Sequence, residues 1–290
     1  MTIYLKRSTD SGAPQLSSVA GSFIALLDYL LVTTLGWTKP YTGTNLAAYR
    51  QPSGTNQMYL RVDDTNASTT RVVAFETMSD VNTGTGQFPT TAQVSGGLYN
   101  EKNATNNYGW TFISDGKIFY LFWGMQVNSY FRSMAFGDFR SYKSGDAFNT
   151  VISANSGTTQ GNAALVTFDT TLASVANTTT YAARSYTQSG TAIRLGVAGN
   201  LALLGSNDPS SGNMQIPSLT TGDVYVAELR LFESTAFRGY YPGLWMHMHR
   251  SSPYNQSVIK IGNRTLEAIW QTYSGGYYAM FIETSDTWGE

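Results

Sequence analysis

The side chains most capable of metal or acid–base chemistry are His247 and His249, the only two histidines in the chain. Residues two apart on a β-strand project from the same face, so both imidazoles would lie side by side. Such a pair supplies two of the ligands that a zinc or iron site requires. The chain has no cysteine, and the acidic candidates for a third ligand, Glu228, Glu233 and Glu267, belong to other segments. Two ligands do not complete a site, so the sequence predicts neither a metal nor another cofactor.

No arrangement of nucleophile, base or phosphate-binding residues stands out. Asp63 and Asp64 would point to opposite faces of a strand, and a turn fits this cluster better. Neither histidine lies near a G-x-S-x-G elbow, and the loop 83–86 lacks the Lys-Ser/Thr pair that follows a phosphate-binding loop. We therefore predict that the protein is not an enzyme. A sugar hydrolase is the weakest alternative, because it requires two convergent carboxylates in a groove.

Two aromatic clusters lie beside glycine or proline and are candidates for contact with protein or sugar. Tyr and Trp provide a large contact area at a low cost in conformational entropy. The candidates for an interface or for ligand contact are Tyr240, Tyr241, Trp245, Tyr273, Tyr277 and Tyr278. The competing interpretation places at least half of them in the hydrophobic core.

The chain carries little charge. Asp, Glu, Lys and Arg make up 13% of its 290 residues, compared with about 25% in an average soluble domain. A weakly charged, aromatic-rich surface loses little solvation energy when another protein covers it. A β-fold rich in Thr and Gly would dilute the charge equally well.

The charge balance and the apolar runs also limit the kinds of partner that the sequence predicts. The formal net charge is −1 and no basic cluster is present, so binding to nucleic acid is not predicted. The N-terminal residues lack the apolar core of a signal peptide. The longest apolar run, 23–35, contains Asp28 and is too short to span a bilayer. We expect a protein that is made in the cytoplasm and has no membrane partner.

One helix and many strands are expected. Ser17–Ser18 offers capping hydroxyls before the apolar run Phe23–Val32, and Gly36 is a plausible stop, so this segment predicts a buried helix. A helix between subunits is the alternative. Alternation predicts a hairpin from strands at 56–62 and 71–76. Asp115–Gly116 between two aromatic runs predicts a second hairpin.

Further strands are expected near the C-terminus, at 224–232, 244–249, 257–261, 265–271 and 277–283. The segment 153–213 is poor in aromatic residues and rich in Thr, Ser and Gly, which predicts an insertion or projecting subdomain. We therefore expect a mainly β protein with an antiparallel sandwich or barrel-like core, one buried N-terminal helix and a projecting middle region. The predicted parts are 1–152, 153–213 and 214–290, where the last packs on the first, with one composite domain as the alternative.

Four stretches of the sequence resemble a family of virion structural proteins of tailed bacteriophages. They are Tyr59–Thr65, Phe75–Pro89, Phe136–Asn149 and Phe281–Trp288. The resemblance covers most of the chain except about 153–213. It implies a structural component encoded among neck and tail genes, and it supplies no catalytic residues.

We therefore expect a homo-oligomeric component of the neck or collar, tail or baseplate of a phage. Its expected partners are copies of itself and other virion proteins, and its expected location is the virion, after assembly in the cytoplasm of the bacterial host. The buried helix and the middle region are the expected subunit contacts. The alternative is a carbohydrate-binding or receptor-binding module of the tail apparatus, which would contact a host-surface glycan through exposed aromatic rings.

Overall fold

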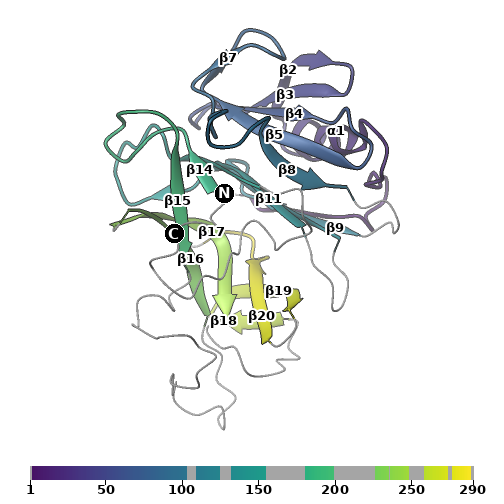
Figure 1. Ribbon diagram of the computed structural model, residues 1–290. Helices are drawn as coiled ribbons and strands as arrows, with labels where there is room; N and C mark the ends of the chain where they lie inside the picture. The colour runs from purple at the N-terminus through teal and green to yellow at the C-terminus, as the bar shows by residue number, and fades with distance from the viewer. Residues whose placement is uncertain are drawn as a thin grey trace.

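The computed structural model describes residues 2–102, 109–124, 132–154, 180–198, 226–234, 236–247, 258–273 and 276–288. Side chains are described in these ranges except at 197–198, 227, 246–247, 270–273 and 276–279. The described chain consists of two large antiparallel sheets, a small hairpin and a helical segment (Figure 1). The predicted fold class, a mainly β protein with an antiparallel sandwich or barrel-like core, is confirmed.

A 13-stranded sheet forms the body of the molecule. In spatial order its strands are β1 (Tyr4–Arg7), β9 (Trp110–Ser114), β10 (Ile118–Trp123), β11 (Arg132–Asp138), β13 (Thr150–Ser153), β14 (Thr180–Ala182), β15 (Ile193–Ala198), β16 (Val226–Glu233), β17 (Ala236–His247), β20 (Gly276–Glu283), β19 (Arg264–Tyr273) and β18 (Val258–Ile261). The short β12 (Arg140–Ser141) pairs with β17 outside this order. An ion pair of 2.5 Å between Arg7 and Glu267 joins β1, at one edge, to β19, next to the other edge. The sheet therefore curls into an open, barrel-like form.

The middle strands of this sheet are buried on both faces. In β10 all six side chains are buried, and they alternate between two hydrophobic cores. Phe119 and Leu121 enter the first core, whereas Ile118 and Tyr120 enter the second. The second core also contains side chains of β16, β17, β19 and β20, so the two halves of the sheet face each other across it. This double burial explains why β10 is apolar at every position, since alternation is expected only where one face meets solvent.

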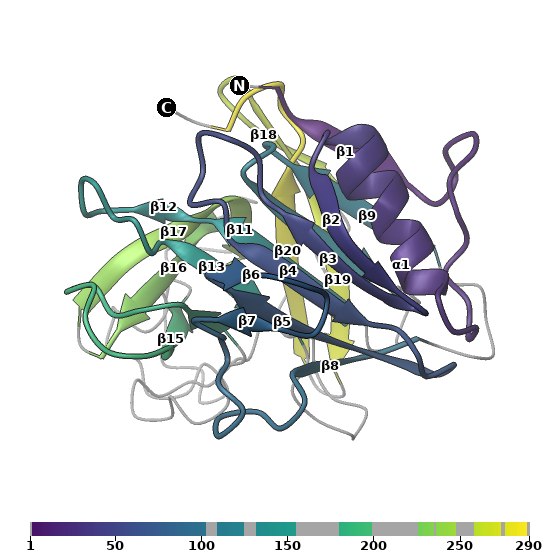
Figure 2. The ribbon, with the colours of Figure 1, turned by 90° about the horizontal axis from the view of Figure 1, so that it is seen from above.

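A five-stranded sheet and the helix cover the first core. In spatial order its strands are β2 (Thr38–Gly43), β3 (Leu46–Arg50), β4 (Tyr59–Asp63), β5 (Thr69–Phe75) and β8 (Leu98–Glu101). The helical segment begins as α1 (Ser22–Leu27) and continues with π-helical hydrogen bonding as η1 (Asp28–Thr34). Its buried side chains pack against both sheets, and the Phe23 ring meets the Trp123 ring edge-on at 5.6 Å between centroids. Figure 2 shows the helix alongside β2 and β9.

The helix occurs where it is predicted, but its start is stabilised differently. The prediction that Ser17–Ser18 caps it is wrong, because the residue before its first turn is Gly21, with φ of 86° and no capping side chain. Instead, the Asp64 carboxylate accepts a hydrogen bond of 2.8 Å from the backbone N–H of Phe23. A carboxylate at this position also suits the positive end of the helix dipole. Gly36 follows the helix with φ of 71°, as expected of a C-terminal stop.

Both predicted hairpins are present. Strands β4 and β5 pair in antiparallel register, as do β9 and β10. At the second turn Gly116 has φ of 87°, a conformation that favours glycine. Of the C-terminal strands, β16, β18, β19 and β20 lie in or beside the predicted ranges, whereas β17 begins at Ala236, eight residues before the strand predicted at 244–249.

A short clasp, β6 (Thr77–Met78) with β7 (Gly84–Thr85), follows β5. Beyond it Phe88 returns to pair with Ala74 through backbone hydrogen bonds of 2.8 and 2.9 Å. The Glu76 carboxylate accepts two hydrogen bonds from the Arg184 guanidinium, at 2.8 and 2.9 Å. Glu76, which joins β5 to the clasp, therefore ties the five-stranded sheet to the turn after β14.

The segment 153–213, expected as an insertion or projecting subdomain, contributes strands to the large sheet. Strand β14 pairs with β13, and β15 pairs with both β14 and β16. Residues 155–179 and 199–225 of this region lie outside the described residues.

Candidate binding cleft

A polar cleft of about 370 Å³ opens where three segments meet. They are the loop 54–56 before β4, the turn 115–117 between β9 and β10, and the segment 138–149 between the end of β11 and the start of β13. Most of the wall comes from the third segment.

Asp138, at the end of β11, holds one side of the cleft together. Its Oδ1 atom accepts hydrogen bonds from Gln51 Nε2 at 2.9 Å and from Thr150 Oγ1 at 2.5 Å. Its Oδ2 atom accepts one from the backbone N–H of Asn56 at 2.9 Å. Burial raises the pKa of the Asp138 carboxyl, and these donors offset part of that rise. The loop before β4 is thereby fastened to β11 and β13.

Asp115 holds the opposite side through its own turn. Its Oδ1 atom accepts hydrogen bonds of 2.9 Å from the backbone N–H groups of Lys117 and Ile118. The residue is buried, which raises the pKa of its carboxyl, while these donors and the nearby charge of Arg140 lower it. The turn that the sequence predicts therefore also places a carboxylate at the cleft.

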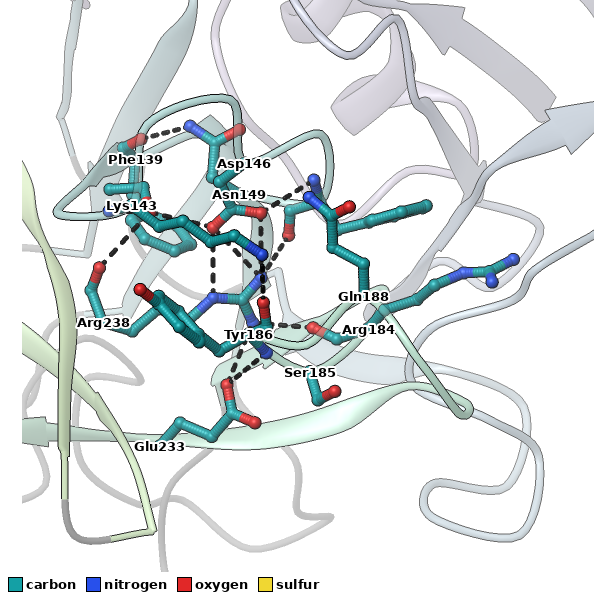
Figure 3. Close-up of polar contacts among 12 residues, drawn as sticks. Phe139, Lys143, Asp146, Asn149, Arg184, Ser185, Tyr186, Gln188, Glu233 and Arg238 are labelled. Atoms are coloured by element: carbon teal, nitrogen blue, oxygen red, sulfur yellow. Dashed lines mark hydrogen bonds and ion pairs between the residues drawn. The ribbon is translucent and has the colours of Figure 1, made fainter.

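Arg238 of β17 stabilises the wall from behind, as Figure 3 shows. Its side chain is fully buried, and its guanidinium lies 3.4 Å from the Asp146 carboxylate and 3.5 Å from that of Glu233. It also donates hydrogen bonds to the backbone oxygens of Phe148, at 2.9 Å, and Arg184, at 2.6 Å. One buried cation therefore fixes the loop 139–149 against β17 and the turn after β14.

Three tyrosines, Tyr142, Tyr186 and Tyr240, lie beside Lys143 or β12, although none of them is among the residues that line the cleft. Lys143 Nζ donates a hydrogen bond of 2.7 Å to the backbone oxygen of Tyr186 and lies 4.8 Å from the centre of its ring (Figure 3). Tyr142, between two residues of the wall, packs on Tyr240 with 5.9 Å between ring centroids. Tyr142 is 54% exposed and Tyr186 is 44% exposed. These two rings rank among the few large apolar side chains at the described surface.

The predicted aromatic residues occupy different environments. Tyr240 is half-buried on β17 opposite Arg140, and Tyr241 is fully buried in the second core, with its hydroxyl 3.3 Å from Thr180 Oγ1. Trp245 is half-buried, and its Nε1 donates a hydrogen bond of 3.0 Å to the Glu283 carboxylate. None of these three tyrosine and tryptophan candidates is among the residues that line the cleft, although Tyr240 pairs with Arg140, which is.

The side chains of the other three candidates lie outside the described residues. Tyr273 lies on β19, and Tyr277 and Tyr278 lie on β20, but their side chains are outside the described residues. The same holds for His247 on β17, and His249 lies wholly outside them. The residues Tyr142, Lys143 and Tyr186 were not predicted, because single aromatic and basic residues in turns form no periodic pattern.

The cleft is chemically suited to hydrogen bonding. Asp115, Asp138 and Asp146 all line it, and each accepts hydrogen bonds from groups of the chain itself. They are therefore held in place as acceptors, with cationic and amide donors beside them. Within the described ranges, no group of three or more His, Asp or Glu residues is placed to hold a metal ion.

No model of a known protein family matches the chain, and no curated protein matches it. Among the described residues, no helix combines the length and apolarity needed to cross a membrane.

Proposed function

We propose that the chain is a non-catalytic structural component of a tailed-phage virion, and that it assembles as a homo-oligomer in the neck or collar, tail or baseplate. The proposed place in a virion is supported by the four stretches of sequence that resemble virion proteins. The assembly is supported above all by one observation, the apolar edge of the large sheet at β18.

Strand β18 ends the large sheet and carries exposed aliphatic side chains. It pairs with β19 on one side, and no described strand pairs with its other side. Val258 is 47% exposed and Ile261 is 42% exposed, whereas Ile259 is buried. Lys260, the one charged residue of the strand, is exposed as well. Proteins that remain monomeric usually protect such edges with charge, proline or a covering loop, because unpaired backbone groups invite another strand. A second copy can pair there about a twofold axis and extend the sheet.

The low charge of the chain favours the same interpretation. With 13% charged residues, the surface offers few ions that would lose hydration when a neighbouring subunit covers it. A ring or shaft built of identical copies requires a large contact area between each pair of neighbours, so the low cost of desolvation applies at every interface.

The oligomeric state of the purified chain tests the proposal. We expect the wild type to form a defined oligomer by size-exclusion chromatography with light scattering, and Ile261→Lys to shift it toward the monomer, because a buried, unpaired ammonium is unfavourable at an interface. Val19→Lys is the matched control, since Val19 is 61% exposed in the loop before α1 and should leave the oligomer unchanged. A wild type that stays monomeric at high concentration would contradict the assembly, and equal effects of both variants would contradict the role of β18.

A further inference from the structure

Three polar side chains meet behind the cleft in an arrangement that suits acyl transfer. Thr150, the first residue of β13, is fully buried, and Gln51, just after β3, is 2% exposed. Thr150 Oγ1 lies 3.5 Å from Gln51 Oε1 and 2.5 Å from Asp138 Oδ1. A hydroxyl nucleophile, a carboxylate base and a carboxamide carbonyl are therefore held together, which is the set of groups that a transfer of the acyl group from nitrogen to oxygen requires.

The Thr150 hydroxyl is oriented for attack. It donates its hydrogen bond to the Asp138 carboxylate, which can take the proton, and it accepts one of 3.1 Å from the Asn56 amide. A second lone pair of the hydroxyl oxygen remains for a bond to carbon. Burial raises the pKa of the Asp138 carboxyl, which makes its carboxylate a stronger base than one in water.

The Gln51 carboxamide is held in a matching way. Its Oε1 atom accepts a hydrogen bond of 3.0 Å from the backbone N–H of Met58, a donor that stabilises negative charge on this oxygen during attack. Its Nε2 atom donates to Asp138 Oδ1 at 2.9 Å and to the backbone oxygen of Lys117 at 3.2 Å. The same carboxylate oxygen therefore contacts the hydroxyl that must lose a proton and the nitrogen that must gain one.

We propose that Thr150 and Gln51 become joined by an ester bond in the folded chain, with Asp138 as the base. Thr150 Oγ1 forms a bond to Gln51 Cδ, and the bond from Cδ to Nε2 breaks. The hydroxyl proton passes through Asp138 to the departing nitrogen, which leaves as ammonia, so the atoms balance without another reactant. Each chain carries out this step once and acts on no other substrate. The cross-link goes beyond the proposed assembly and does not depend on it.

The surroundings favour the ester once it has formed. Both partners are buried, so the bulk water that would hydrolyse the bond is kept away from them. Asp138 and Asn56 also line the cleft, which gives ammonia a route to solvent. Ammonia is diluted and protonated there, which draws the transfer toward the ester. Because Gln51 follows β3 and Thr150 begins β13, the bond joins the five-stranded sheet covalently to the large sheet.

Intact-mass spectrometry of the full-length chain, purified and then incubated at neutral pH, tests the proposal. After allowance for removal of Met1, we expect a mass below that of the sequence by one ammonia, about 17 Da. Digestion with trypsin should release residues 51–61 and 144–184 as one covalently joined pair, which mild alkali separates. A wild type that keeps the full mass overturns the proposal, and so does a loss of ammonia without this joined pair.

Four variants test the roles of the residues. Thr150→Val and Asp138→Asn should keep the full mass, because the first lacks the nucleophile and the second lacks the base, whereas Thr150→Ser should still lose ammonia. Thr70→Val is the matched control, since Thr70 is 1% exposed and its hydroxyl donates to the backbone oxygen of Asp63. It should lose ammonia as the wild type does. Loss of ammonia from Thr150→Val, or from Asp138→Asn as fast as from the wild type, overturns the proposal. The wild-type mass decides the matter even if a variant fails to fold.

Discussion

Aspartate is buried in two regions of this molecule, at the start of the helix and around the cleft, and the two settings differ in what holds the charge. Asp64 pairs with the ammonium of Lys102, and both side chains are completely buried. Asp115 and Asp138 lie at an opening, and the hydrogen bonds that hold them come from backbone N–H, amide and hydroxyl groups. An enclosed carboxylate matched by a buried cation can only support the fold. A carboxylate fixed by neutral donors at a cleft also has acceptor capacity to offer a ligand.

The largest effect should come from breaking the enclosed pair. Asp64→Ala removes the helix cap and leaves the Lys102 ammonium buried without its partner, so we expect a loss of about 3–5 kcal/mol in the free energy of unfolding. Denaturant titration at neutral pH measures it. The neighbouring Asp63→Ala is the control, because Asp63 is partly exposed and bonds within its own turn, and it should cost less than about 1 kcal/mol.

The double variant Asp64→Leu with Lys102→Met sharpens this prediction. Replacing a buried ion pair by apolar side chains of similar volume is often close to neutral, so much of the lost stability should return. The helix cap stays absent in the double variant, and recovery should therefore be incomplete. A single variant no less stable than Asp63→Ala would remove the distinction between the two regions.

A smaller effect is expected at the cleft. Asp138→Asn keeps the size of the side chain but leaves one acceptor oxygen, and its amide then faces either the backbone N–H of Asn56 or the donors Gln51 and Thr150. We expect a loss of about 1–3 kcal/mol, the cost of one unsatisfied buried donor. Thermal and denaturant unfolding measure it. If Asp138→Asn loses more free energy of unfolding than Asp64→Ala, the Asp138 carboxylate contributes more to stability than its neutral hydrogen-bond partners indicate.

The smallest expected effect is a difference between the wild type and Asp115→Asn in how the free energy of unfolding depends on pH. Burial raises the pKa of the folded Asp115 carboxyl above its unfolded value of about 4. Folding therefore binds a proton, and the stability that this group contributes is present below the unfolded pKa and is lost as pH rises through the folded pKa. Asp115→Asn retains a carbonyl acceptor for the turn and does not titrate.

Relative to the wild type, the free energy of unfolding of Asp115→Asn should thus increase as pH rises from about 4 toward neutrality. Parallel denaturant titrations across this range measure the difference. A difference that decreases with pH would mean that Arg140 and the turn donors outweigh burial.

The sequence anticipates most of the fold because its signals are local. Asp115–Gly116 indicates a hairpin through turn chemistry alone, and β4 alternates as a half-buried strand should. The helix cap was missed for the opposite reason, since Asp64, just after β4, reaches the N-terminus of the helix from 41 residues away. A nearby pair of serines looks like the better cap in the sequence, although tertiary structure supplies another.

The candidate site was much harder to predict. The cleft forms where residues 54–56, 115–117 and 138–149 come together. Pairing between strands that are distant in the sequence brings these three segments together. Tyr142 and Tyr186 carry no periodicity that would distinguish an exposed ring from a buried one. Tyr241 illustrates the converse, because it lies in an aromatic cluster beside glycine and proline but is fully buried.

The central proposal, that many copies of this chain build part of a virion, is tested most directly by quantitative mass spectrometry of purified particles of any tailed phage whose genome encodes the chain. We expect peptides of the chain at a fixed stoichiometry of several copies per particle, retained after the particles are washed at high salt. Absence of the chain from intact particles, with the protein found only in the infected-cell lysate, would contradict the account.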